Sequence, residues 1–258
     1  MSQRSGYEPG VPCWVDLSST DVDASVRFYG EVFGWSAEMI DDPEAGGYGQ
    51  FVHDGKKVAG VGPVFNEGMP SVWNTYVATE DAAATADRAK NAGGTVVMEP
   101  MQIFEEGRMA IFQGPDGAFV SVWEAGRHKG AELVNEPVSF CWNELVTRDV
   151  AAAERFYQTV FGWTPNPQEM DGVTYTEWQA GGRSIAGMME MSPNYPPETP
   201  SHWMVYFAVA DLDDTIANAT RLGANVLIDS MEAPPGRFGM FIDPQGAAVS
   251  VIQLTETQ

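Results

Sequence analysis

The sequence is poor in basic residues. It contains 14 Lys and Arg against 36 Asp and Glu, which gives a formal net charge of −22. A surface of this charge repels phosphate groups, so we expect neither nucleic acid nor an anionic membrane as a partner. Solubility alone also explains the excess of acid, and we prefer that interpretation.

Cysteine and long apolar runs are scarce as well. The two cysteines, Cys13 and Cys141, do not make a disulfide framework, and we interpret both as small apolar strand residues. No apolar run is long enough for a transmembrane helix. The first residues lack the apolar core of a signal peptide, so we expect a cytoplasmic protein.

Common catalytic motifs are also absent. The sequence contains no GxGxxG, GxxxxGK, CxxC or HExxH motif, and no nucleophile stands beside a base in a recognisable pattern. Any chemistry must therefore be sought in side chains that the fold brings together.

What the sequence does contain is an internal repeat. The segment 13–35 opens with Cys-Trp-Val-Asp-Leu and closes with Phe-Gly-Trp, and it recurs 128 positions later as 141–163, which opens with Cys-Trp-Asn-Glu-Leu. A period of this length matches one small domain and is too long for a solenoid unit. The repeat predicts a domain at 1–125, a polar linker at 126–138 and a second domain at 139–258.

Hydrophobic periodicity and turn residues predict one order of elements four times. In the first domain we expect strands at 11–18, 35–40, 48–53, 58–64, 73–79, 95–98, 108–112 and 119–124, and helices at 21–33 and 81–92. In the second we expect strands at 139–146, 163–168, 203–209, 225–229, 237–242 and 247–253, a hairpin at 173–191, and helices at 149–161 and 211–222. The proline-rich stretch 192–200 is expected to be a stiff loop. The chain thus holds four strand-helix-strand-strand-strand modules, two per domain.

Three signatures together resemble the vicinal-oxygen-chelate superfamily, which includes glyoxalase I, bleomycin-resistance proteins and extradiol dioxygenases. They are Phe-Tyr followed by Phe-Gly-Trp at the end of the first helix, a second helix closed by glycine, and Pro-x-Gly before the last strand. The resemblance covers 11–125 and 139–253. Within the superfamily, the tandem chain is similar to two-domain actinobacterial members related to a mycobacterial 27 kDa antigen and to "hydroxylase" proteins of antibiotic gene clusters. This resemblance implies an α+β fold of tandem glyoxalase-like domains, whose curved mixed sheets enclose cavities.

The resemblance also assigns positions to the four places where metal-using members carry ligands. These places fall on Trp14, Gln50, Asn74 and Ser121 in the first domain, and on Trp142, Glu177, Met204 and Ser250 in the second. Only Glu177 could bind a hard cation, and one carboxylate does not make a zinc or iron site. We therefore predict no metal cofactor and expect these eight residues to contact a small ligand. The alternative is a divalent metal in the second cavity, held by a shifted site of Glu144, Glu177 and His202.

Asp16 and Glu144 carry the catalytic prediction. Each is an acid in mid-strand, two residues beyond the first ligand place and on the same face. A carboxylate that faced the cavity would have a raised pKa suited to proton transfer, so we predict both residues to be catalytic bases. The alternative pairs them with Arg27 or Arg155 of the following helix, or exposes them to solvent at the strand end.

Aromatic residues complete the prediction, and Tyr76 and Tyr206 are repeat equivalents among them. Core packing explains some of these rings, but inward-facing ones would make flat, apolar cavities suited to a planar ligand. We predict a protein that binds a small aromatic or carbonyl-bearing metabolite, either as a binding or resistance protein or as a metal-independent accessory enzyme of secondary metabolism. The alternative is a metal-dependent glyoxalase-like or dioxygenase-like enzyme. We expect a monomer or weak homodimer, because the fused pair already supplies a two-domain contact.

Overall fold

The computed structural model describes residues 3–170 and 172–255. The first half contains β1 (Pro12–Ser19), α1 (Val22–Phe33), β2 (Ser36–Met39), a short 3-10 helix (Pro43–Ala45), β3 (Gly49–His53), β4 (Lys56–Pro63), β5 (Val72–Thr79), α2 (Ala82–Asn91), β6 (Thr95–Ile103), β7 (Gly107–Gln113) and β8 (Phe119–Ala125). The second half contains β9 (Phe140–Thr147), α3 (Val150–Phe161), β10 (Thr164–Met170), β11 (Val173–Ala180), β12 (Arg183–Glu190), β13 (His202–Ala208), α4 (Leu212–Arg221), β14 (Asn225–Ala233), β15 (Gly236–Ile242) and β16 (Ala248–Leu254).

The four predicted modules are confirmed, and each predicted helix and strand forms. Two strands are longer than predicted by four or more residues, since β6 continues to Ile103 and β14 to Ala233. Each of these strands has two irregularities in its pairing with the next strand. Such bulges break the alternation of side chains, which is why the periodicity ends early in both places.

Local chemistry explains where the helices begin and end. Each of the four helices α1 to α4 begins at an aspartate whose carboxylate accepts a hydrogen bond from a backbone N–H of the first turn. The helices α1 and α3 end at Gly34 and Gly162, whose φ values of 71° and 70° are left-handed. Glycine adopts this conformation without strain, so the chain can turn directly into the next strand.

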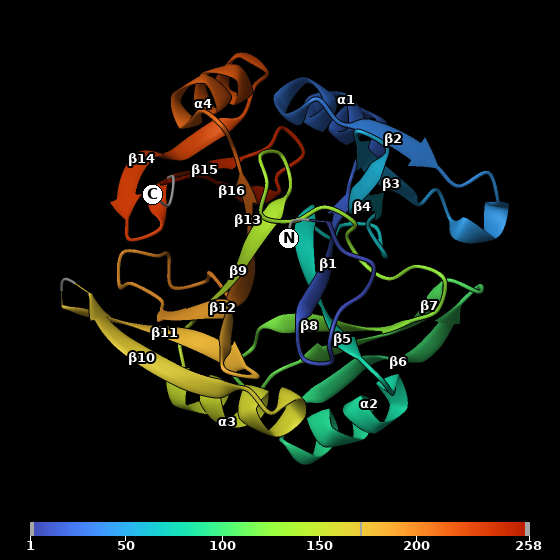
Figure 1. Ribbon diagram of the computed structural model, residues 1–258, viewed down its shortest axis with the longest axis vertical. Coiled ribbons are helices and arrows are strands. Elements are labelled where there is room, and N and C mark those ends of the chain that lie inside the picture. Colours follow the sequence, from blue (N-terminus) through green and yellow to red (C-terminus); the bar gives the residue numbers. More distant parts are fainter. Residues whose placement is uncertain (1–2, 171, 256–258) are drawn as a thin grey trace.

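The strands form two eight-stranded mixed sheets of identical order. The order is β2-β3-β4-β1-β5-β8-β7-β6 in the first half and β10-β11-β12-β9-β13-β16-β15-β14 in the second. In each sheet the two central strands, β1 and β5 or β9 and β13, are antiparallel, and each is parallel to its other neighbour. Both sheets are strongly curved, and their helices lie on the convex sides (Figure 1).

The two sheets lie back to back, so their concave faces open in opposite directions (Figure 1). The central strands β5 and β13 are in contact, α1 lies against α4, and α2 lies against α3. A buried hydrogen bond of 2.8 Å joins Thr75 Oγ1 to Asn143 Oδ1 across the junction. Reciprocal bonds from the indole nitrogens of Trp35 and Trp163 reach the carbonyls of Val138 and Gly10 at 2.8 Å and 2.6 Å.

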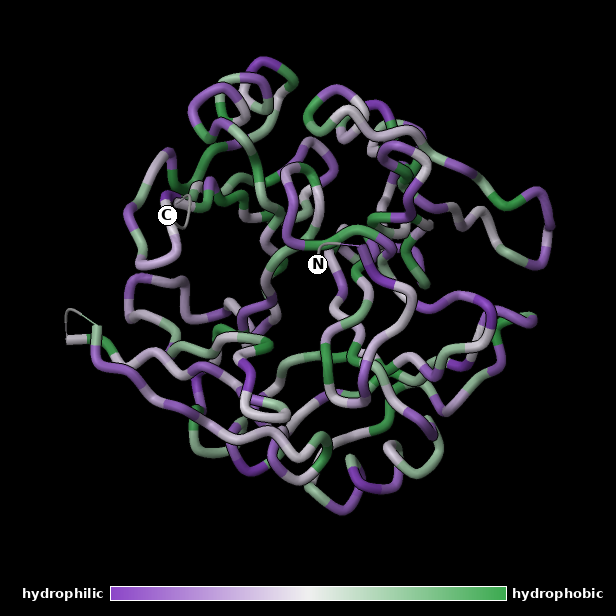
Figure 2. Tube along the Cα trace, viewed as in Figure 1, coloured by the Kyte–Doolittle hydropathy of each residue, from purple (hydrophilic) through white to green (hydrophobic). Residues whose placement is uncertain are grey.

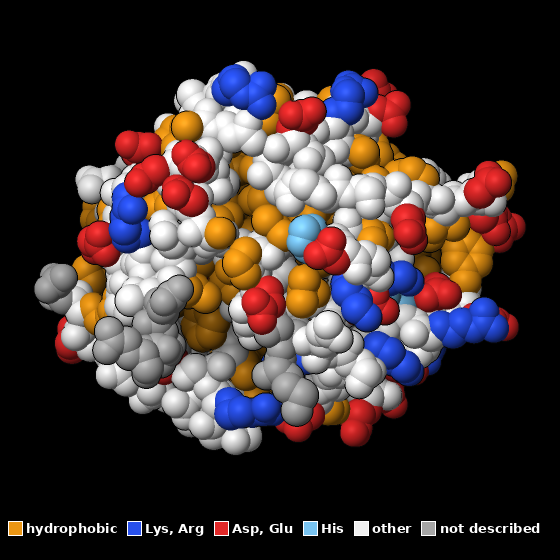
Figure 3. Space-filling model, turned by 45° about the horizontal axis from the view of Figure 1, so that its top comes forward, with side chains coloured by type: hydrophobic (Ala, Val, Ile, Leu, Met, Phe, Trp, Pro, Cys, Tyr) orange, Lys and Arg blue, Asp and Glu red, His pale blue; other side chains and the backbone are white. Residues whose placement is uncertain are grey.

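Apolar segments gather along the strands, and hydrophilic ones lie on the outer helices and loops (Figure 2). Acidic side chains are spread over both halves of the face shown in Figure 3 rather than gathered in one patch. Within the described residues, no helix has the length and apolar character needed to cross a membrane.

Candidate functional site

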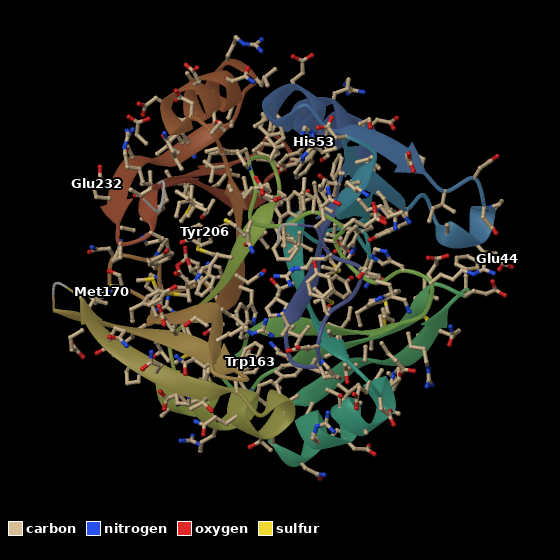
Figure 4. The ribbon with its side chains drawn as sticks, in the orientation of Figure 1. Glu44, His53, Trp163, Met170, Tyr206 and Glu232 are labelled. Carbon is tan, nitrogen blue, oxygen red and sulfur yellow. The ribbon has the colours of Figure 1, made fainter. Side chains whose placement is uncertain are left out.

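The register of the strands places all twelve predicted site residues on the two concave faces. In the first sheet one row of paired residues is Gln50, Gly60, Asp16 and Asn74, and the next is Trp14, Tyr76 and Ser121. In the second sheet the rows are Glu177, Gly187, Glu144 and Met204, then Trp142, Tyr206 and Ser250. We call these sets the first and the second polar face. Figure 4 shows Tyr206 between the two arms of the second sheet, whose tips are marked by Met170 and Glu232.

Asp16 is the centre of a hydrogen-bond network on the first polar face, and its exposed fraction is only 6%. Its Oδ1 accepts a bond of 2.8 Å from Asn74 Nδ2. Its Oδ2 accepts bonds of 2.8 Å from the Tyr76 hydroxyl and 3.3 Å from the Tyr48 hydroxyl. Trp14 Nε1 in turn donates to the Tyr48 oxygen at 3.1 Å. The carboxylate therefore has neutral donors in place of a cation.

Glu144 occupies the same place on the second polar face. Its Oε1 accepts a bond of 3.1 Å from the Tyr206 hydroxyl, and the Tyr175 hydroxyl also favours the ionised form of the carboxyl and lowers its pKa. Trp142 Nε1 donates to the Tyr175 oxygen at 2.9 Å. The apolar side chain of Met204 stands where the first half has Asn74, so Glu144 has fewer donors than Asp16.

The alternative ion pairs with helix arginines do not form. Arg27 and Arg155 are both exposed, and within 3–170 and 172–255 neither makes an ion pair with Asp16 or Glu144. The reason is the side of the sheet on which the acids lie. Trp73 and Trp203 bond Tyr29 of α1 and Tyr157 of α3, and the alternation of strand side chains places Asp16 and Glu144 on the opposite side.

Two tyrosines of these networks, Tyr48 and Tyr175, were not among the predicted site residues. They are repeat equivalents at a separation of 127, one less than in the opening segment, because the preceding loop and hairpin differ in length. Each lies across a glycine of the next strand, and a Cβ built at Gly60 or Gly187 would overlap the tyrosine hydroxyl. The glycines in mid-strand were the available signal, since they mark a close approach of another group.

Burial sets the protonation of both networks. It raises the pKa of the Asp16 and Glu144 carboxyls, and the hydrogen bonds from the amide and hydroxyl donors oppose the rise. Burial and the adjacent carboxylate raise the pKa of Tyr76 and Tyr206 well above the usual range of tyrosine. The phenols thus stay protonated and act as donors, while the carboxylates are bases stronger than exposed ones.

The residues present do not fit a metal. At the places where metal-using relatives carry ligands, the first half has a Trp, a Gln, an Asn and a Ser, none of which supplies a negative charge. In the shifted alternative, Glu177 accepts a bond from Ser184 Oγ at 2.7 Å and His202 Nδ1 lies 2.8 Å from the Pro200 carbonyl. No group of three His, Cys, Asp or Glu residues in the described part of the chain could hold a metal ion, so the shifted triad was wrong.

Family models match both halves of the chain. A model of the Glyoxalase/Bleomycin resistance protein/Dioxygenase superfamily matches residues 13–122, and a model of a glyoxalase-like domain matches residues 140–252.

Relatives of the same two-domain length are known. The anthracycline biosynthesis protein DnrV of Streptomyces peucetius is 41% identical over 264 residues, which cover 97% of this chain and 95% of DnrV. CFP32 of Mycobacterium bovis, described as a candidate glyoxylase, is 41% identical over 259 residues, or 98% of each chain.

Solved structures share the fold at low identity. The Mn(II)-bound glyoxalase of Novosphingobium aromaticivorans has a TM-score of 0.65 at 18% identity and covers 98% of this chain and 83% of its own. The 2,2',3-trihydroxybiphenyl 1,2-dioxygenase of Sphingomonas wittichii has a TM-score of 0.64 at 14% identity, with coverages of 97% and 93%. Identities this low bear on the fold alone.

Proposed function

Because the chain belongs to the glyoxalase/bleomycin resistance/dioxygenase superfamily, with two such domains in tandem, we propose that each polar face binds a small planar aromatic metabolite that carries carbonyl or hydroxyl groups. Binding uses the carboxylate and tyrosine hydroxyls of the face in place of a metal. Membership and the relatives in antibiotic biosynthesis support a protein that binds or processes a metabolite. The aromatic class of the ligand and the metal-free mode are our proposal.

The observation that carries the proposal is a similar network in both halves: an acid buried on a concave face beside two tyrosine hydroxyls. A buried charge is costly, and a fold that needs only stability loses nothing by an apolar residue there. Two such acids at equivalent places are therefore better explained by a ligand that they contact.

The chemistry of the faces indicates the class of ligand. On the second face Trp142 offers a flat apolar wall, and a hydroxyl of the ligand can donate to Asp16 or Glu144 while a carbonyl accepts from a tyrosine. The networks are largely removed from water, so each polar contact is stronger than at the surface. DnrV and its relative DauV of Streptomyces sp. strain C5 are named as anthracycline biosynthesis proteins, and this supports an aromatic ligand with adjacent oxygens.

A second candidate function is proton transfer on the bound metabolite. The raised pKa of both carboxyls favours it, because a base with a pKa nearer to neutrality also returns the proton. Glu144 is the stronger candidate base, since Met204 removes the amide donor that Asp16 receives from Asn74.

The test is a titration with 1,4-dihydroxyanthraquinone followed by tryptophan fluorescence, after which the probe is recovered and analysed by mass spectrometry. Binding alone predicts saturable quenching and unchanged probe. Asp16→Asn and Glu144→Gln should each weaken binding at its own face about tenfold, the loss of one charge-assisted bond of about 1.4 kcal/mol.

The exposed acid Asp23 provides the matched control, and Asp23→Asn should leave the titration unchanged. A product with an altered mass that disappears in the double variant would establish the second candidate instead. Quenching that the double variant does not change would overturn both.

A further inference from the structure

A cavity lies where β9 and β12 begin, next to the second polar face. It is bounded by 140–143 of β9 and 183–185 of β12, and by N-terminal and linker residues, which are Arg4, Gly6, Tyr7, Glu8, Val11, Pro12, Val134 and Asn135. Its volume is about 300 Å³, which is at the lower end for small-molecule sites. We call it the end pocket.

The linker fills the equivalent place in the first half. The repeat equivalents of the pocket walls are 12–15 of β1 and 56–58 of β4. There the Ala131 amide donates to the Cys13 carbonyl at 2.8 Å, and the Glu132 amide donates to the Lys57 carbonyl at 2.8 Å. The Lys57 amide returns a bond of 2.9 Å to the Glu132 carboxylate. Linker residues therefore join β1 to β4 at the point where the second half has a cavity.

His128 completes this filling with a planar ring. Its imidazole meets the Trp14 ring edge-on at a centroid distance of 4.4 Å, and the centroid of the Trp123 ring lies 5.6 Å from it. Burial lowers the His128 pKa to about 4, so the ring is neutral at physiological pH. It is 93% buried, since its exposed fraction is 7%, yet its Nε2 has no hydrogen-bond partner. Such an orphan atom needs an explanation, and here the ring serves as a space-filling group rather than as a polar contact.

Trp142, the equivalent of Trp14, has no such ring against it. It lines the end pocket, and no aromatic ring of residues 3–170 or 172–255 pairs with it. Phe140, Ile185 and Tyr7 supply further apolar walls. The first half thus shows what fits beside this tryptophan, namely a neutral planar ring of about the size of imidazole or benzene.

The rim of the pocket carries positive charge in an otherwise acidic protein. Arg183 pairs with Glu8 at 2.6 Å, and Arg4 has no ion-pair partner among the described residues. One guanidinium is therefore left to bind an anion, and its planar fork suits a carboxylate.

We propose that the end pocket binds a small aromatic carboxylate, with the ring against Trp142 and the carboxylate at Arg4. The end pocket shares Trp142 with the second polar face, but it uses Arg4 in place of Glu144, and the proposal does not depend on the function proposed for that face.

The test uses 4-fluorobenzoate as the probe and follows its fluorine resonance by NMR during titration. We expect one saturable site per chain. Binding should weaken about tenfold in Arg4→Ala, and the neutral 4-fluorobenzamide should bind the unchanged protein equally weakly.

Gly6 offers a way to block the pocket, because a Cβ built there meets no atom within 4 Å and its backbone is not left-handed. Gly6→Phe should abolish binding, and Gly6→Ala is the matched control that should retain it.

Other outcomes would overturn the proposal. Binding that survives Gly6→Phe places the probe elsewhere, and binding lost in Glu144→Gln but not in Gly6→Phe places it on the second polar face. Glu144→Gln should leave this binding intact even where it weakens binding of the anthraquinone, so the two proposals fail separately.

The first half provides a converse test. His128→Gly removes the natural filling, so added imidazole should raise the melting temperature of this variant and not that of the unchanged protein. His128→Phe keeps a ring in place and should fold without imidazole. If imidazole left the melting temperature of His128→Gly unchanged, the comparison between the two halves would be wrong.

Discussion

At the scale of single residues, a tryptophan, a tyrosine and an acid form the same relay in both halves. The indole N–H of Trp142 donates to the Tyr175 oxygen, and the Tyr175 hydroxyl lowers the pKa of Glu144 against the rise that burial causes. The phenol is thus fixed as a donor, and this arrangement favours the ionised carboxylate against the cost of burial. The relay prepares the acid to accept a proton or a hydrogen bond from a ligand.

The pH dependence of stability tests whether burial raises the pKa of the Glu144 carboxyl by more than the hydroxyl donors lower it. The folded pKa of Glu144 is raised above its ordinary value of 4.5, so its contribution to stability is fully present below pH 4.5 and is lost as pH rises through the folded pKa. Glutamine does not titrate. The free energy of unfolding of Glu144→Gln minus that of the unchanged protein should therefore increase with pH above 4.5, by at most about 1.4 kcal/mol per pH unit.

Urea unfolding at pH 4.5, 5.5, 6.5 and 7.5 provides the measurement, with Asp23→Asn as the control for loss of one surface charge. A difference that falls as pH rises would mean that the hydrogen bonds dominate and that the carboxyl pKa is depressed.

Sequence reasoning at this scale found the acids but missed two of the four tyrosines around them. Asp16 and Glu144 stand out because an acid within an apolar strand is rare, and strand alternation fixes the face on which they lie. Tyr48 and Tyr175 approach across a hairpin whose loop lengths differ between the halves, so no fixed period connects them to the acids. Their roles in binding or catalysis stay predictions until a ligand is measured.

At the scale of elements, a glycine in mid-strand makes room for each tyrosine. Gly60 of β4 lies directly opposite Asp16, and Gly187 of β12 lies directly opposite Glu144. A side chain at either position would occupy the space of the tyrosine hydroxyl. Each glycine thus leaves the space in which a tyrosine can reach across its strand toward the acid of the central strand.

Gly187→Ala should therefore displace Tyr175 and break its contacts with Trp142 and Glu144. We expect a loss of about 1–3 kcal/mol in the free energy of unfolding, as for other overpacked sites, together with weaker binding of 1,4-dihydroxyanthraquinone. Urea unfolding and fluorescence titration measure the two effects. Gly6→Ala adds the same methyl group in open space and should change neither. An unchanged affinity in Gly187→Ala would remove Tyr175 from the binding network.

The order of elements was predictable because helix and strand periods, aspartate caps and glycine stops are local signals. The full length of β6 and β14 was not, because the bulges that extend these strands depend on pairing with β7 and β15. The bulges matter for the site, since both strands form the outer arms of the concave faces.

At the scale of the whole molecule, the two halves stabilise each other through buried polar contacts. Trp73 Nε1 donates to the Tyr29 oxygen at 2.9 Å, and the Tyr29 hydroxyl donates to Asp243 Oδ2 in the other half at 2.8 Å. The equivalent tyrosine, Tyr157, accepts a bond of 2.9 Å from Trp203. The repeat predicted two similar halves, but it did not predict their back-to-back arrangement. A sequence repeat shows which residues are equivalent and does not show which faces of the two sheets come into contact.

Tyr29→Phe tests this coupling. It leaves the Asp243 carboxylate without its partner from the other half and should lower the free energy of unfolding by about 1–3 kcal/mol. One cooperative transition should remain, because the apolar contacts between the halves are intact. Tyr195→Phe removes a hydroxyl from a partly exposed ring and serves as the control in the same urea unfolding experiment. A split into two transitions would show that this bond is needed to hold the halves together.

A crystal structure of the protein with 1,4-dihydroxyanthraquinone tests the central claim most directly. The account predicts the probe on a concave face, with one of its oxygens within hydrogen-bond distance of Asp16 and Tyr76 or of Glu144 and Tyr206. Probe density away from both faces, with the two carboxylate networks unchanged, would contradict it.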